Sequence, residues 1–215
     1  VRGLGVGPFI DERLVTEAPA RAFAEHRAAD VPLIIGANDN EASLLANISV
    51  GSNRALADAG PRLRALYGNV SDEEFERQAM GDAIFVGPAA WIAAQTADGA
   101  PTYLYHFTYV PERLRDSIPG ARHGGEIPYV FQTLGQTPFS ANPTEQDRAF
   151  STMISSCWAS FAKTGQPACA GGPVWPAYSA QADQLMLFGA NTRVAPQPRR
   201  AAIDVLLATM MARSQ

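Results

Sequence analysis

The stretch VPLIIG, residues 31–36, constrains the fold more than any other part of the sequence, because it is a continuous apolar run of strand length. A strand that is apolar on both faces must be covered on both sides, as in the parallel sheets of α/β proteins. Glycine and polar residues follow directly in GANDNEAS, where open α/β sheets place their functional sites. The sequence therefore predicts an α/β fold with a parallel strand buried on both faces, and it makes Asp39 and Glu41 candidate site residues.

Helices and short extended segments are predicted along the rest of the chain. A second strand is expected over residues 101–110, which are dense in aromatic and β-branched residues. Short extended pieces are expected at 174–179 and 184–189. A short helix is predicted at residues 18–28, and amphipathic helices are predicted at 144–164 and 200–215. Several helices are predicted between residues 42 and 97, with breaks at 50–53, 59–61, 67–72 and 86–88. One of these is capped by Ser71 and runs through Met80.

The predicted helix at 144–164 carries the clearest local signals. Thr144 and Asp147 have the spacing of a capping box, and Gly165 is a stop signal. One face of this helix is apolar and consists of Phe150, Ile154, Cys157, Trp158 and Phe161. Cys157 and Cys169 lack the spacing of a zinc site; they form either one local disulfide bridge or two unpaired thiols.

Composition and charge exclude several classes of function. With 47% hydrophobic and 18% charged residues, the 215-residue chain has the composition of a globular protein. Its net charge of -4 provides no basic surface for a nucleic acid. No apolar run reaches the length of a membrane-spanning helix, and no metal-binding motif occurs, so neither a membrane span nor a metal nor another cofactor is expected. The single lysine, Lys163, and the abundance of Ala, Gly and Pro favour a bacterial source.

His123 lies within a long irregular stretch, residues 111–143, and is flanked by glycines in GARHGGEIPYVF. The imidazole of such a histidine is free to act as a base, although a solvated loop histidine is the alternative. Asp39 and Glu41 either orient this imidazole or cap the helix that follows them. His26 and His106 fall in a predicted helix and strand and are interpreted as structural. No G-x-S-x-G motif supplies a nucleophile.

Four segments, in this order, resemble the C-terminal portion of the type-B carboxylesterase family, the cholinesterase and para-nitrobenzyl esterase group of α/β-hydrolases: VPLIIGANDNEASLL, PTYLYHFTYVPERLR, GARHGGEIPYVF and WASFAKTGQP with VWPAYS. The resemblance implies that Glu41 is the acid of a catalytic triad and His123 is its base. Glu126 matches the carboxylate that follows the base. The family usually has glycine after the acid, where this chain has Ala42.

The resemblance also implies what surrounds these residues. Residues 1–215 would be the C-terminal part of one α/β-hydrolase catalytic domain, a mostly parallel sheet flanked by helices with a helical gorge or cap segment. The serine nucleophile and the oxyanion loop would lie upstream of Val1, in an N-terminal remainder joined covalently or as a separate chain. The substrate would be a small-molecule carboxylic ester, and this chain alone would be inactive. Phe85, Trp91 and Phe131 are candidate walls of the substrate pocket, with core packing as the alternative.

A catalytically inactive binding or adhesion module with the esterase fold is the alternative function. The presence of Glu41 and His123 argues against it. Substrate specificity and localisation, whether cytoplasmic or exported, are left open by the sequence.

Overall fold

The computed structural model describes residues 9–45 and 54–212 of the 215-residue chain. Its elements are α1 (Pro19–Ala24), β1 (Leu33–Asn38), η1 (Glu41–Leu45), α2 (Arg54–Leu66), α3 (Asp72–Gly81), η2 (Asp82–Val86), α4 (Gly87–Thr96), β2 (Thr102–Phe107), η3 (Glu112–Leu114), α5 (Ile127–Val130), η4 (Pro138–Ser140), α6 (Glu145–Thr164), β3 (Gln184–Phe188), β4 (Arg193–Pro196) and α7 (Arg200–Ala212).

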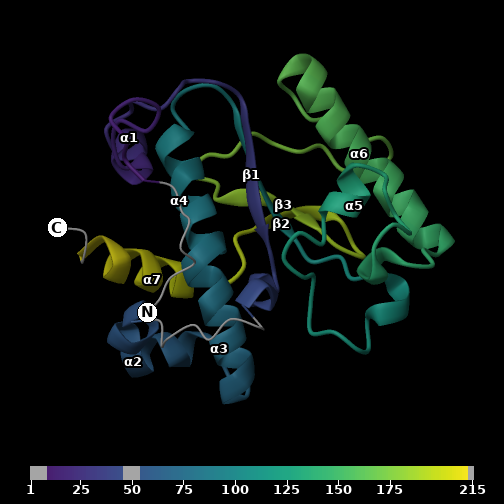
Figure 1. The fold of residues 1–215 in the computed structure, drawn as a ribbon, viewed down its shortest axis with the longest axis horizontal. Coiled ribbons are helices and arrows are strands. Elements are labelled where there is room, and N and C mark those ends of the chain that lie inside the picture. The colour runs from purple at the N-terminus through teal and green to yellow at the C-terminus, as the bar shows by residue number, and fades with distance from the viewer. Residues whose placement is uncertain (1–8, 46–53, 213–215) are drawn as a thin grey trace.

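A four-stranded sheet in the order β1-β2-β3-β4 forms the centre of the described structure. Strands β1, β2 and β3 are parallel, and β4 pairs antiparallel with β3. Helices α4 and α7 lie on one side of the sheet, and α5 and α6 lie on the other (Figure 1). The predicted α/β class with a mostly parallel sheet is therefore confirmed. Strand β4 was not predicted, because RVAP carries no alternating apolar pattern.

Strand β2 supplies core side chains to both faces of the sheet, because successive side chains of a strand alternate between faces. Tyr103 and Phe107 pack in a cluster with α6 residues such as Ile154. Leu104 packs instead against alanines of α4, including Ala93. The buried alanines of α4 form the face of the helix that packs against the strand.

Strand β1 differs from its prediction. Residues Leu33–Gly36 are only half-buried, and Val31, which precedes the strand, is 58% exposed. The reason is that β1 stands at the edge of the described sheet and pairs there with β2 alone. An apolar run shows that a strand needs cover, but it does not show which element provides that cover.

The helical breaks are partly confirmed. Helix α2 kinks at Gly60, which has a φ of 57° and precedes Pro61, and α3 begins after Ser71, whose side chain accepts a hydrogen bond from the Glu74 N–H. The break predicted at 86–88 is wrong. The π-helical turn η2 joins α3 to α4 without a loop, and Pro88 stands in the first turn of α4, where its missing N–H is tolerated.

Other boundaries shift by smaller amounts. Helix α1 is shorter than the predicted 18–28, and residues 174–179 form no strand of the sheet. The predicted break at 50–53 lies outside the described residues. Cys157 and Cys169 form a disulfide bridge, which decides between the two alternatives for these cysteines and ties α6 to the segment that follows it.

The capping box of α6 is confirmed and extends beyond the helix. Thr144 Oγ1 accepts from the Asp147 N–H at 3.2 Å, and Asp147 Oδ2 accepts from the Thr144 N–H at 2.9 Å. Asp147 Oδ1 also accepts from the Tyr109 hydroxyl at 2.7 Å and the Glu112 N–H at 3.1 Å. One carboxylate thus ties the start of α6 to the segment that follows β2.

We expect Thr144→Ala to lower the free energy of unfolding by about 1 kcal/mol, because the Asp147 N–H loses its partner. Thr152→Ala is the matched control, since Thr152 is exposed on the same helix and its hydroxyl only donates to the Arg148 carbonyl within it. Urea denaturation followed by circular dichroism measures both. An equal effect of the two changes would contradict the role assigned to the cap.

Candidate active site

Glu41 and His123 meet at the carboxyl end of β1. His123 Nδ1 is hydrogen-bonded to Glu41 Oε2, across 82 positions of the sequence. The other carboxylate oxygen, Glu41 Oε1, accepts from the Asn38 backbone N–H at 2.7 Å. Glu41 is 5% exposed, whereas the His123 side chain is 38% exposed. The carboxylate is therefore buried and fixed, and it holds one nitrogen of a ring that remains accessible.

The backbone of the histidine loop, residues 120–126, is attached to the segment that follows β1. Asn40 pairs with Arg122 in a short parallel bridge, and the Asn40 N–H donates to the Ala121 carbonyl at 3.0 Å. The His123 N–H donates to Ser43 Oγ at 2.9 Å. Gly124 has a φ of 70°, a left-handed conformation that glycine adopts without strain. These contacts fix the direction in which the loop presents His123.

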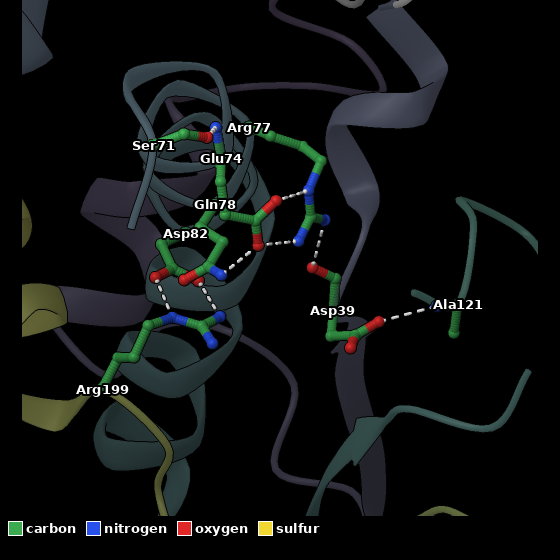
Figure 2. A network of polar contacts seen from close by, with 8 residues as sticks. All are labelled: Asp39, Ser71, Glu74, Arg77, Gln78, Asp82, Ala121 and Arg199. Carbon is green, nitrogen blue, oxygen red and sulfur yellow. Dashed lines mark hydrogen bonds and ion pairs between the residues drawn. The ribbon is translucent and has the colours of Figure 1, made fainter. Parts of the chain in front are cut away.

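Asp39, the second candidate acid, contacts the loop backbone rather than the ring. Its Oδ1 accepts from the Ala121 N–H at 2.7 Å, as Figure 2 shows. Burial raises the pKa of Asp39 to about 6, against the lowering effects of the Ala121 hydrogen bond and nearby Arg77. Arg77 donates to the Asp39 carbonyl at 3.3 Å and pairs with Glu74 at 2.5 Å. Glu41 rather than Asp39 therefore contacts the His123 ring.

Glu126 lies at the end of the histidine loop, directly before α5. Its Oε2 accepts from the Asn38 side-chain amide at 2.5 Å. The same amide donates to the Arg122 carbonyl at 2.7 Å. Glu126 thus reaches the Glu41–His123 pair through Asn38, a residue that the sequence analysis did not single out. Its sequence signal is a polar side chain at the end of the apolar run that forms β1.

A cavity of about 460 Å³ opens beside His123. Mostly apolar side chains line it, including Leu44, Pro111, Ile118, Ile127 and Phe139. Arg122 adds a cation, with its guanidinium carbon 4.2 Å from the centre of the Phe139 ring. An apolar cavity beside an accessible imidazole suits a small uncharged organic molecule.

The three predicted wall residues are placed differently. The Phe85 ring packs against the His123 ring, with 5.1 Å between their centres. Trp91 is half-buried in α4, and Phe131 is 71% exposed after α5. None of the three lines the cavity just described. Their role as pocket walls stays a prediction.

The other two histidines have no place in this site. His106 is 2% exposed, and burial lowers its pKa to about 4, so its ring is neutral at pH 7. His26 is an exposed residue just after α1. In the described ranges 9–45 and 54–212, no group of three or more His, Cys, Asp or Glu side chains is arranged to bind a metal. The same ranges contain no helix with the length and apolarity needed to cross a membrane.

The geometry defines what the pair can do chemically. A carboxylate on Nδ1 stabilises the imidazolium form of His123 and fixes its orientation. The opposite nitrogen, Nε2, is then the atom that exchanges a proton with a reacting group. The pair can therefore act as a general base and then as a general acid.

Curated carboxylesterases are similar in sequence to this chain. Carboxylesterase 5A of Felis catus is 29% identical over 95% of this chain and 43% of its own length. The para-nitrobenzyl esterase of Bacillus subtilis (strain 168) is 28% identical over 89% of this chain and 41% of its own length. The chain thus spans less than half the length of these curated relatives.

Solved structures agree with the sequence relatives. A PNB esterase aligns with a TM-score of 0.72 at 26% identity, covering 93% of this chain and 43% of that chain. The Geobacillus stearothermophilus carboxylesterase EST55 at pH 6.2 aligns with a TM-score of 0.74 at 26% identity, covering 93% of this chain and 46% of that chain. The model of the family described as "Carboxylesterase family" matches residues 67–206. The chain therefore belongs to the carboxylesterase family, and it corresponds to the C-terminal portion of a type-B carboxylesterase with the α/β-hydrolase fold.

Proposed function

We propose that this chain supplies the acid and the base of a Ser-His-Glu triad that hydrolyses carboxylic esters, with Glu41 as the acid and His123 as the base. The observation that carries the proposal is the hydrogen bond from His123 Nδ1 to a buried carboxylate. A solvated loop histidine needs no such partner. The exposed ring beside an apolar cavity adds support, since an ester must reach Nε2.

The proposed reaction is acyl transfer in two steps. His123 Nε2 takes the proton of a serine hydroxyl as the serine oxygen attacks the ester carbonyl, and it then gives that proton to the leaving alcohol. Water attacks the resulting acyl-serine ester with His123 again as the base, which releases the acid and restores the serine. Glu41 stabilises the imidazolium in both steps through Nδ1.

The serine and the oxyanion donors belong, in this proposal, to a remainder of the complete protein outside residues 1–215. The coverage of the curated relatives, 43% and 41% of their lengths, supports this division. The remainder is a partner of this chain, either joined covalently or as a separate chain. Without it, the 215-residue chain is expected to show no turnover of an activated ester, because a base alone cannot form the acyl intermediate.

Two conservative substitutions in the complete protein separate the roles of the carboxylates. We expect Glu41→Gln to lower kcat by about a hundredfold or more, because the imidazolium loses its counter-charge. Glu126→Gln should cost about tenfold or less, since Glu126 contacts Asn38 rather than the ring. Steady-state hydrolysis of para-nitrophenyl acetate measures both.

Glu145→Gln provides the matched control for these changes, because Glu145 is exposed at the start of α6. Its kcat should equal that of the unchanged protein. A Glu41→Gln enzyme with nearly full activity would exclude Glu41 as the triad acid. Absence of esterase activity in the unchanged complete protein would instead favour the inactive binding module.

A further inference from the structure

Asn38, the last residue of β1, touches both members of the carboxylate network around His123. Its backbone N–H donates to Glu41 Oε1 at 2.7 Å. Its side-chain nitrogen Nδ2 donates to the Arg122 carbonyl at 2.7 Å and to Glu126 Oε2 at 2.5 Å. The residue is 2% exposed, so water does not compete for these hydrogen bonds.

The two side-chain hydrogen bonds of Asn38 go to residues that precede and follow His123 in the sequence. A primary amide nitrogen has two N–H donors, and here each has its own acceptor. Arg122 immediately precedes His123, and Glu126 closes the loop three residues after it. One buried side chain therefore holds both ends of the segment around His123 and connects it to the end of β1.

The chemistry of this position selects an amide. A carboxylate of the same shape at position 38 would have no donor for the Arg122 carbonyl and would repel Glu126. An alanine would remove both of these hydrogen bonds. Neither change touches the ring of His123, and the hydrogen bond of Glu41 to the backbone N–H of residue 38 remains available.

We propose that Asn38 is a positioning residue for the esterase reaction: its amide sets the distance of His123 from the serine that it must deprotonate. The inference rests on the proposed function of Glu41 and His123. A displacement of the loop weakens proton transfer in the transition state while substrate binding changes little, because geometry at the reacting atoms controls kcat.

The test uses the complete protein and reverses the polarity of one hydrogen bond. We expect Asn38→Asp to lower kcat for para-nitrophenyl acetate by about ten- to a hundredfold, with a change in KM of about threefold or less. Adding Glu126→Gln supplies an amide that can donate to the new carboxylate. The double variant should regain about tenfold in kcat over Asn38→Asp alone.

The recovery in the double variant gives a second reading. A loss of stability alone predicts no such recovery of kcat.

Control variants keep the outcomes distinct. Asn191→Asp, at an exposed turn between β3 and β4, should leave kcat and KM unchanged. If Asn38→Asp fails to fold, Asn38→Ala replaces it, with a lower kcat and a nearly unchanged KM expected. Near-normal kcat in a folded Asn38 variant, or no recovery in the double variant, would overturn the inference. If His123→Ala keeps full activity, the proposed function itself fails, whatever the Asn38 variants do.

Discussion

His123→Ala in the complete protein is expected to lower kcat by about three or more orders of magnitude, with a smaller effect on KM. The imidazole is needed when the serine loses its proton and when the leaving alcohol gains one, and both events occur in the transition state rather than on binding. Because the His123 side chain is 38% exposed, its removal should disturb the fold little. The change therefore separates chemistry from stability.

Steady-state kinetics on para-nitrophenyl acetate, with folding checked by circular dichroism, measures this effect. His26→Asn is the control, since His26 is exposed and asparagine tolerates its φ of 53°. It should retain normal turnover. A folded His123→Ala protein that is nearly as active as the unchanged one would make His123 an ordinary solvated loop residue.

The choice between Asp39 and Glu41 shows how far sequence alone reaches. Both acids follow the same strand, and spacing left open which of them orients the histidine. The answer depends on a contact across 82 positions, between the start of η1 and the histidine loop. Local patterns do not contain that contact. The resemblance to a known family identified Glu41 because it compares whole motifs in order.

Other features of the fold could not be predicted from local sequence patterns for a similar reason. The apolar run of β1 predicted a strand correctly, yet its half-buried state depends on its place at the edge of the described sheet. The Gly87-Pro88 pair usually signals a break in a helix. Here a π-helical turn precedes the proline, and the helix continues through it. Asn38 could not be singled out from the sequence, because its three hydrogen-bond partners come close to it only in the folded loop.

An ion pair between buried Asp82 and partly buried Arg199 joins η2 to the segment before α7 (Figure 2). Arg199 Nε donates to Asp82 Oδ2 and Nη2 to Oδ1, each at 2.7 Å. The Tyr67 hydroxyl also donates to Oδ2 at 2.8 Å. Asp82 begins η2, the turn that carries Phe85 to the His123 ring. The pair therefore attaches the segment before α7 to the turn that contacts the proposed base.

We expect Arg199→Met to lower the free energy of unfolding by about 3–5 kcal/mol, because it leaves the carboxylate of Asp82 buried without its cation. The Asp82 side chain is only 1% exposed beside the guanidinium. Arg200→Met is the matched control. The Arg200 side chain is 46% exposed and pairs with Asp183 and Asp204 near the surface, so its loss should cost about 1 kcal/mol or less.

Urea denaturation of the complete protein measures these changes, and one further variant tests the cause. In Asp82→Asn with Arg199→Met, the residue at position 82 is neutral and still accepts from the Tyr67 hydroxyl. The uncompensated charge is then gone, so the double variant should be more stable than Arg199→Met alone. If the double variant were less stable than the single one, the loss would come from the packing of the arginine stem rather than from a stranded carboxylate. If Arg199→Met lowered the free energy of unfolding no more than Arg200→Met does, the Asp82–Arg199 pair would not stabilise the junction between η2 and the segment before α7.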